Sequence, residues 1–163
     1  MAAERSRTTT WSDPRDVVAA LAELDGLEAL ERTLVGELPY PPIAETFGMR
    51  LVGVEAGHVV WEAEPGEHLY NPIGTVHAGF AVTLLDSAMG TAFVSVAKAG
   101  TRWTTLELKT SFIRAITADT GVVRSTGSIL NRGRRVVTTE ARLEDAEARL
   151  LAHATSTILV LAA

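Results

Sequence analysis

The spacing of apolar and polar residues predicts a helical N-terminal part. Apolar residues recur at helical spacing over residues 17–34, with a break at Gly26. The pair Asp13–Pro14 suits the cap and first turn of a helix that begins there. Residues 1–12 are polar and are expected to form a leader without regular structure. Residues 1–40 are therefore predicted to be a leader followed by a helical extension.

Two short alternating runs and one long apolar run follow. Met49–Glu55 and His58–Glu64 alternate between apolar and polar residues and are joined around Ala56–Gly57, which predicts a β-hairpin. The next segment, Pro65–Gly74, is dense in turn-forming residues and reads as a loop. The nearly continuous apolar stretch from Val76 to Ala97 predicts one long buried helix.

The remainder of the chain, after Gly100, is rich in Val, Thr, Leu and Ile, which favour strands. Two polar segments, Asn131–Arg135 and Glu144–Ala148, have the composition of hairpin turns. The strands expected between these breaks are Thr104–Arg114, Thr120–Leu130, Val136–Leu143 and Leu150–Leu161.

This order of elements predicts an α+β fold. A helix that is apolar on nearly all sides must be covered on nearly all sides, and a curved antiparallel sheet wrapped around it achieves this. Small residues in the helix, such as Ala81, Ala88 and Gly90, would let the sheet approach closely. The layout is that of a hotdog fold, in which residues 41–163 form the domain and an extra helix precedes it.

Composition narrows the function classes. With 163 residues, 47% of them hydrophobic and 21% charged, the chain is expected to form one domain with a sizeable core. The net charge of −5 argues against a nucleic-acid partner, which usually selects a basic face. Cysteine is absent and the N-terminus is too polar for a signal peptide, so a cytoplasmic location is expected.

The stretch Ala78–Ala97 has the length of a membrane span of about 20 residues. However, Asp86 lies in its middle, and a charge at that depth costs about 2.5–3.5 kcal/mol on the insertion scale. No cluster of Lys or Arg flanks the stretch. A buried helix is the better prediction, and no membrane partner is expected.

The segment Asn71–Gly90, which reads NPIGTVHAGFAVTLLDSAMG, carries the candidate chemistry. It resembles hotdog thioesterases of the phenylacetate-degradation (PaaI-like) type. That family shows an Asn, a loop, His-Gly-Gly at the helix start, and an acidic residue seven positions after the second of those glycines. The matching residues here are Asn71, His77-Ala78-Gly79 and Asp86. The strand Thr104–Ala115 also resembles the family's next strand, although Arg114 is followed by Ala where the family often has Pro.

The resemblance implies hydrolysis of an acyl-CoA thioester, and helix chemistry agrees with it. The attacked carbonyl gains negative charge, and the first N–H groups of a helix are unpaired at the positive end of its dipole. In the family the residue after His donates such an N–H group, which here is that of Ala78, and Gly79 leaves room beside it. Asp86 would be the general base or the nucleophile. At 1.5 Å per residue it lies about 12 Å beyond Ala78, so the two groups converge only if a second chain supplies one of them.

The other candidate residues have structural alternatives. Asn71 is expected to orient the thioester or the water, yet Asn-Pro also opens ordinary turns. His77 is expected either to donate to the carbonyl or only to cap the helix. Thr105 matches a hydroxyl position that positions water in relatives, although Thr is common in strands. Asp86 itself would otherwise be a buried, hydrogen-bonded carboxylate.

Four arginines are candidates for the phosphates of coenzyme A, because the guanidinium fork matches phosphate geometry. They are Arg114, Arg132, Arg134 and Arg135, and a solvated hairpin is the alternative for each. The histidines lack metal-ligand spacing, and no phosphate loop or nucleophile elbow is present. No metal or redox cofactor is expected, since coenzyme A enters as part of the substrate.

The sequence thus predicts an acyl-CoA thioesterase that acts on aromatic or medium-chain acyl groups. It is expected to be a homodimer or homotetramer with the active site at the dimer interface. The alternatives are a non-hydrolytic hotdog protein that binds acyl-CoA, which would lack the acid, and a dehydratase acting on a hydroxyacyl thioester, which pairs a His with an acid differently.

Overall fold

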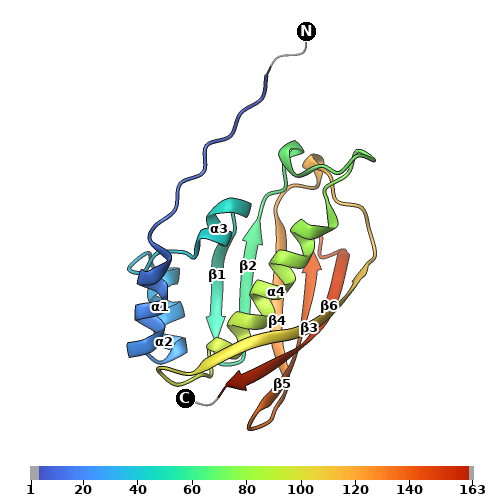
Figure 1. The fold of residues 1–163 in the computed structure, drawn as a ribbon. Coiled ribbons are helices and arrows are strands. Elements are labelled where there is room, and N and C mark those ends of the chain that lie inside the picture. Colours follow the sequence, from blue (N-terminus) through green and yellow to red (C-terminus); the bar gives the residue numbers. More distant parts are fainter. Residues whose placement is uncertain (1–3, 162–163) are drawn as a thin grey trace.

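The computed structural model describes residues 4–161, in which a curved sheet surrounds one long helix (Figure 1). The start of the expected leader, residues 1–3, lies outside the described residues, and residues 4–13 contain no helix or strand. The helices are α1 (Pro14–Glu23), α2 (Gly26–Leu34), α3 (Pro42–Phe47) and α4 (Ala78–Val94), with short 3-10 turns η1 (Glu67–Leu69) and η2 (Ala118–Thr120). The strands are β1 (Arg50–Glu55), β2 (His58–Ala63), β3 (Arg102–Phe112), β4 (Val123–Arg132), β5 (Val136–Glu144) and β6 (Leu150–Leu161).

The six strands form one antiparallel sheet in the order β1-β2-β4-β5-β6-β3. β3 follows α4 in the chain but lies at the far edge, where it pairs with β6 from Arg102 opposite Leu161 to Phe112 opposite Ala152. Figure 1 shows α4 running across the inner face of the sheet. The predicted α+β hotdog fold, with its central helix and curved antiparallel sheet, is confirmed.

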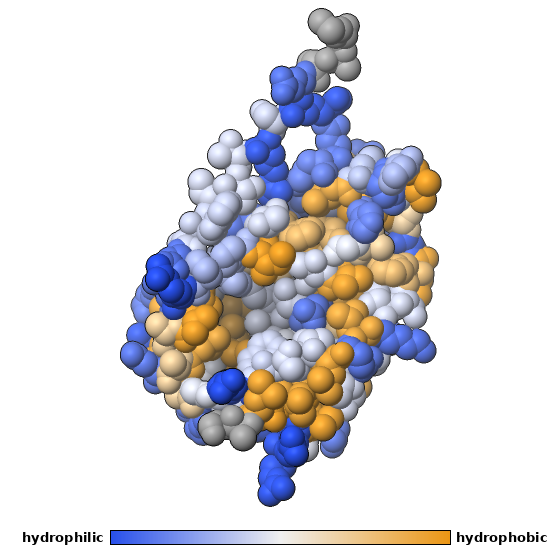
Figure 2. All heavy atoms as spheres, in the orientation of Figure 1, coloured by the Kyte–Doolittle hydropathy of each residue, from blue (hydrophilic) through white to orange (hydrophobic). Residues whose placement is uncertain are grey.

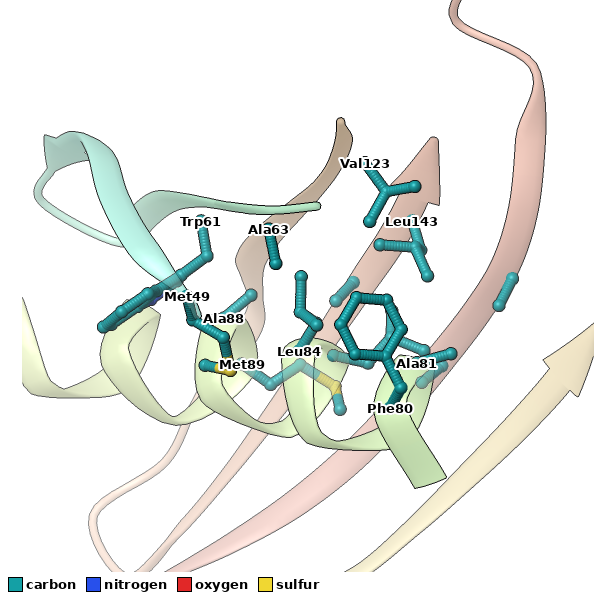
Figure 3. Packing of buried hydrophobic residues seen from close by; sticks show 14 of the residues in the cluster. Met49, Trp61, Ala63, Phe80, Ala81, Leu84, Ala88, Met89, Val123 and Leu143 are labelled. Carbon is teal, nitrogen blue, oxygen red and sulfur yellow. The ribbon is translucent and has the colours of Figure 1, made fainter. Parts of the chain in front are cut away.

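The core lies between α4 and the sheet (Figure 3). Phe80, Leu84 and Met89 of α4 are fully buried there. The helix backbone approaches the sheet closely at Gly127 of β4, where an added Cβ would lie 2.2 Å from the carbonyl oxygen of Ala88. The sequence predicted small residues on the helix for this purpose, and the structure adds a glycine on the strand facing it.

The predicted N-terminal helix with a break at Gly26 is confirmed as two helices, α1 and α2. Asp13 caps α1 by accepting the N–H of Arg15. α2 buries Ala29 and Leu30, and Leu30 belongs to the main core. α1 has no fully buried residue, because its apolar stripe faces a cavity described below.

The predicted bounds of the long helix need correction. The long helix spans Ala78–Val94 rather than residues 76–97, because the Val76 N–H donates to the carbonyl of Ile116 and His77 is the cap. The short helix α3 begins at a proline, Pro42. A proline in the first turn loses no hydrogen bond, because that N–H has no partner within the helix. No helix within residues 4–161 is long and apolar enough to cross a membrane.

Candidate active site

The N-terminus of α4 is organised by His77. Its side chain caps the helix, and the Gly79 N–H donates to Nδ1 at 2.9 Å. Because Nδ1 accepts, the neutral ring carries its proton on Nε2, which leaves a donor free to reach outward. A Cβ at position 79 would lie 2.9 Å from Nδ1, so glycine at this position makes room for the cap. Of the two roles predicted for His77, the cap is present and leaves donation by Nε2 available.

The N–H of Ala78 is the donor predicted for the substrate oxygen. Ala78 is the first residue of α4, and none of the residues 4–161 accepts a hydrogen bond from its N–H. The residue is exposed, so a ligand can approach the group. An unpaired N–H at the positive end of a 17-residue helix is suited to stabilising a negative oxygen.

Asn71 holds the loop before α4. Its Oδ1 accepts the N–H groups of Ile73 at 3.0 Å and Thr75 at 3.2 Å, while Nδ2 donates to the Thr75 hydroxyl at 2.9 Å. The turn-forming role considered for Asn-Pro is therefore present. The amide nitrogen carries two hydrogens and the contact with Thr75 uses one of them.

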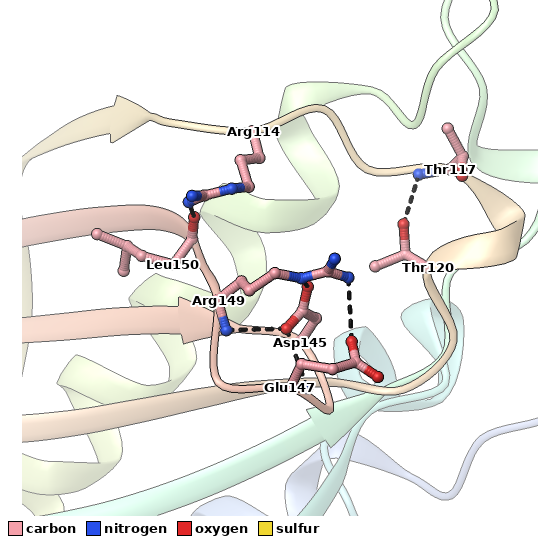
Figure 4. Close-up of polar contacts among 7 residues, drawn as sticks. All are labelled: Arg114, Thr117, Thr120, Asp145, Glu147, Arg149 and Leu150. Carbon is pink, nitrogen blue, oxygen red and sulfur yellow. Dashed lines mark hydrogen bonds and ion pairs between the residues drawn. The ribbon is translucent and has the colours of Figure 1, made fainter.

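Asn71, His77 and Ala78 line one cavity of about 260 Å³, together with Phe112 at the end of β3 and Arg114 just after it. We call it the loop cavity. Arg114 also donates to the carbonyl of Leu150 at 2.6 Å, which fixes its guanidinium beside the start of β6 (Figure 4). The structure thus brings four of the predicted site residues together at one end of α4.

Asp86 lies in a second cavity of about 190 Å³, which we call the acid cavity. The hydroxyl of Thr105 donates to Oδ1 of Asp86 at 3.2 Å. Burial raises the pKa of the Asp86 carboxyl, and the hydrogen bond from Thr105 lowers it to a smaller extent. A half-buried carboxyl with a raised pKa and a hydroxyl beside it has the features of a general base or nucleophile.

The two cavities are separate within one chain. None of the residues that line the loop cavity lines the acid cavity. Asp86 follows Ala78 by eight residues on a continuous helix, a rise of about 12 Å. The structure therefore presents two half-sites, one with hydrogen-bond donors and one with an acid.

The structure does not bring the four predicted arginines together. Arg132 donates to the carbonyl of Val96, just beyond the C-terminal end of α4, and Arg134 and Arg135 are exposed in the same β4–β5 turn. Arg114 lies instead with Ala78 at the opposite end of that helix. Their separation follows from the antiparallel sheet, because β3 and β4 end at opposite ends of α4. The four arginines therefore do not form one group, and of them Arg114 alone lines the loop cavity.

The sequence interpretation missed two residues of the acid cavity, Trp61 of β2 and Trp103 of β3. Their strands are not neighbours in the sheet, and the two side chains line the same cavity because the sheet curves around α4. The indole N–H of Trp61 donates to the Thr91 hydroxyl at 2.9 Å. Among residues 4–161, no three His, Asp or Glu side chains are grouped to hold a metal ion.

Comparisons with known proteins agree with the geometry. Residues 73–152 match the family model described as the thioesterase superfamily. The chain is 26% identical over 118 residues to a 1,4-dihydroxy-2-naphthoyl-CoA hydrolase of Listeria monocytogenes, covering 72% of this chain and 94% of that protein. A phenylacetic acid degradation-related protein of Ralstonia eutropha JMP134 has a similar structure (TM-score 0.73, 30% identity, 80% of this chain and 98% of that one). So does a mutant of the phenylacetic acid degradation protein PaaI of Thermus thermophilus (TM-score 0.67, 26% identity, 74% and 99%).

Proposed function

The chain belongs to the thioesterase superfamily and is a thioester hydrolase, and we propose that it acts on acyl-CoA with an aromatic or medium-chain acyl group at a site shared by two chains. The resemblance of Asn71–Gly90 to PaaI-like thioesterases is confirmed by the structural relatives. The observation that carries the proposed site is Asp86, hydrogen-bonded to Thr105 of β3, on the same helix whose first N–H has no partner among the described residues.

The loop cavity supplies the electrophilic half of the proposed site. The thioester oxygen accepts the N–H of Ala78, and Nε2 of His77 and the second amide hydrogen of Asn71 are further donors beside it. These groups stabilise the oxygen as it gains charge, and removing one such donor typically lowers kcat about 10²–10³-fold. Arg114, at the rim of the same cavity, is the candidate contact for a phosphate of coenzyme A.

Asp86 supplies the other half. As a base, it takes a proton from a water molecule whose oxygen bonds to the acyl carbon, the C–S bond breaks, and the thiolate of coenzyme A takes up the proton. As a nucleophile, its carboxylate forms an anhydride with the acyl group, the thiolate leaves, and water then cleaves the anhydride. Thr105 positions the carboxylate in both routes. Single turnover in oxygen-18 water, with analysis of label in both protein and product, distinguishes them.

The free edge of β3 supports the participation of a second chain. β3 ends the strand order and pairs only with β6 among the described residues. Leu106 and Phe112 of this strand are 55% and 53% exposed. An 11-residue edge strand with exposed apolar side chains is a template for pairing with another strand, and a second copy of β3 is a self-complementary partner.

The placement of both half-sites along β3 favours an antiparallel pair. Thr105 contacts Asp86, and Phe112 lines the loop cavity seven residues later. With a two-fold axis between Leu108 and Lys109, Thr105 of one chain lies opposite Phe112 of its partner. Pairing in this register carries the acid of one chain toward the donors of the other, and two equivalent sites form.

A panel of acyl-CoA thioesters, with release of free thiol as the readout, tests the proposed function. We expect turnover by the wild-type protein and a loss of about 10²–10⁴-fold in Asp86→Asn, the usual contribution of a positioned base. Asp119→Asn, an exposed aspartate in η2, is the matched control and should retain the wild-type rate. Full activity in Asp86→Asn removes the proposed mechanism. Acyl-CoA binding without thiol release favours the non-hydrolytic alternative, and hydration or dehydration of a hydroxyacyl thioester favours the dehydratase.

A further inference from the structure

A third cavity, of about 190 Å³, lies between the N-terminal helices and the C-terminal half of α4. We call it the helical cavity. Its wall includes Val17, Ala20 and Leu21 of α1 and Leu30 of α2. Figure 2 shows this face of the molecule hollowed between the N-terminal helices and the centre, with hydrophobic residues in the walls. This hollow explains why the apolar stripe of α1 is only half-buried.

The helical cavity adjoins the acid cavity. Four residues line both, namely Pro41, Trp61, Thr91 and Trp103. Trp61 is held by its hydrogen bond to Thr91, and Trp103 packs edge-to-face on Phe93 with ring centroids 5.7 Å apart. The two indoles therefore stand at the boundary between a cavity that contains Asp86 and a cavity closed by the N-terminal helices.

The lining of the helical cavity suits an apolar group without polar substituents. Its two hydroxyl groups already donate within the protein, Thr33 to the carbonyl of Ala29 at 2.9 Å and Thr91 to that of Ser87 at 2.6 Å. The remaining wall is almost entirely aliphatic or aromatic. A ligand hydroxyl placed there would lose its hydrogen bonds to water and would find no free hydroxyl donor in the cavity wall. This disfavours hydroxylated acyl groups.

The wall formed by α1 and α2 is firmly attached. The Gly26 N–H donates to the carbonyl of Ala97 at 2.9 Å, and the Gly100 N–H donates to that of Leu21 at 3.0 Å. Asp25 forms an ion pair with Lys98 at 2.7 Å. α2 also packs so closely on α4 that a Cβ on Gly26 would lie 1.8 Å from the carbonyl oxygen of Val94. α1 and α2 therefore form a fixed wall of the helical cavity.

We propose that the N-terminal helices form the closed end of the acyl pocket, so that the preferred substrate carries an aliphatic acyl chain. The inference rests on the proposed function. The acyl chain of the substrate passes Asp86, crosses between Trp61 and Trp103, and ends in the helical cavity of the protomer that supplies this Asp86. An engineered apolar cavity of about 150 Å³ holds a benzene ring, so two cavities of this size accept roughly twelve carbons. Aliphatic acyl groups of about eight to twelve carbons are therefore favoured over short or hydroxylated aromatic ones.

Filling the helical cavity tests this directly. Ala20→Phe places a ring in the cavity, whereas Ala19→Phe adds the same ring on the exposed side of α1 and is the matched control. We expect kcat/KM for decanoyl-CoA and dodecanoyl-CoA to fall about 10–100-fold in Ala20→Phe, with hexanoyl-CoA changed less than about threefold. Ala19→Phe should keep the wild-type profile. A second variant, Leu38→Ala, enlarges the same cavity and should move the optimum to longer chains.

Several outcomes would overturn the inference. One is an equal loss for all chain lengths in Ala20→Phe, and another is an unchanged optimum in a folded Leu38→Ala variant. A third is hydrolysis of a 12-hydroxydodecanoyl thioester as fast as that of dodecanoyl-CoA. If the wild-type protein hydrolyses hexanoyl-CoA and the substitutions leave the chain-length preference unchanged, the inference fails but the proposed function stands. If it hydrolyses no acyl-CoA, the proposed function fails instead.

Discussion

Replacing Gly127 by alanine tests whether the central helix is held against the sheet as closely as the fold requires. A Cβ at this position would lie 2.2 Å from the Ala88 oxygen, 2.3 Å from its carbonyl carbon and 2.9 Å from the Met89 nitrogen. All three atoms belong to the backbone of α4, so no side chain can turn aside. The closest gap must open from 2.2 Å to more than 3.0 Å, which requires the helix or the strand to move.

Overpacking of a core usually costs about 1–3 kcal/mol, and we expect the upper end here because the obstacle is backbone. A loss of about 3 kcal/mol lowers the Tm of a chain of this length by roughly 6–12 °C. The same movement displaces Asp86, two residues before Ala88, from Thr105, and misplacement by about 1 Å can cost 10²-fold in rate. Thermal unfolding and thiol release, at equal protein concentration, measure both effects. Gly53→Ala is the control, since its Cβ meets only the Val60 side chain at 3.4 Å. A Gly127→Ala variant with wild-type Tm and rate would refute this account of the packing.

Further predictions concern the acid and the sheet. Because the carboxyl of Asp86 must be ionised to act and burial raises its pKa, kcat/KM should decline on the acidic side at a higher pH than for an ordinary aspartate. Thr105→Val removes the hydrogen bond that lowers this pKa, so its pH–rate profile should show the decline at still higher pH. Thr105→Ser is the control and should keep the wild-type profile. An unchanged profile in Thr105→Val would contradict this role of Thr105. The buried hydroxyl of Thr139 has no partner among the described residues, so Thr139→Val should raise the Tm by roughly 2–4 °C, given about 1 kcal/mol for the unpaired group. A fall in Tm would mean that the hydroxyl is satisfied.

The fold was predictable because its signals are local. The alternating runs predicted β1 and β2, and the unbroken apolar run predicted α4, since a helix covered on all sides carries little polar surface. The helix ends were less predictable, because they depend on distant groups, such as the carbonyl of Ile116 that binds the Val76 N–H. The position of β3 at the far edge is likewise a property of pairing with β6, which no local pattern encodes.

The candidate site was predictable where residues lie close along the chain, as from Asn71 to Asp86. Thr105 was selected only by resemblance, and the structure places it on the acid from a strand that follows the helix. Trp61 and Trp103 were missed because they line one cavity only when the sheet curves. The positions of the four arginines were not predictable, because their shared chemistry does not indicate the end of an antiparallel sheet at which each of them lies.

The shared site is the central claim, and two inactive variants mixed in one dimer test it most directly. Asp86→Asn removes the acid. Ala78→Pro removes the donor N–H while keeping a residue that is well tolerated at the first helical position.

Each variant alone should be nearly inactive. Refolding or co-expressing them together should restore thiol release to about a quarter of the wild-type rate, because half of the dimers are mixed and each of these has one intact site. If each chain held a complete site of its own, the mixture would stay as inactive as its parts. Recovery of activity is the result we predict, and its absence in dimers shown to be mixed would contradict the two-chain site.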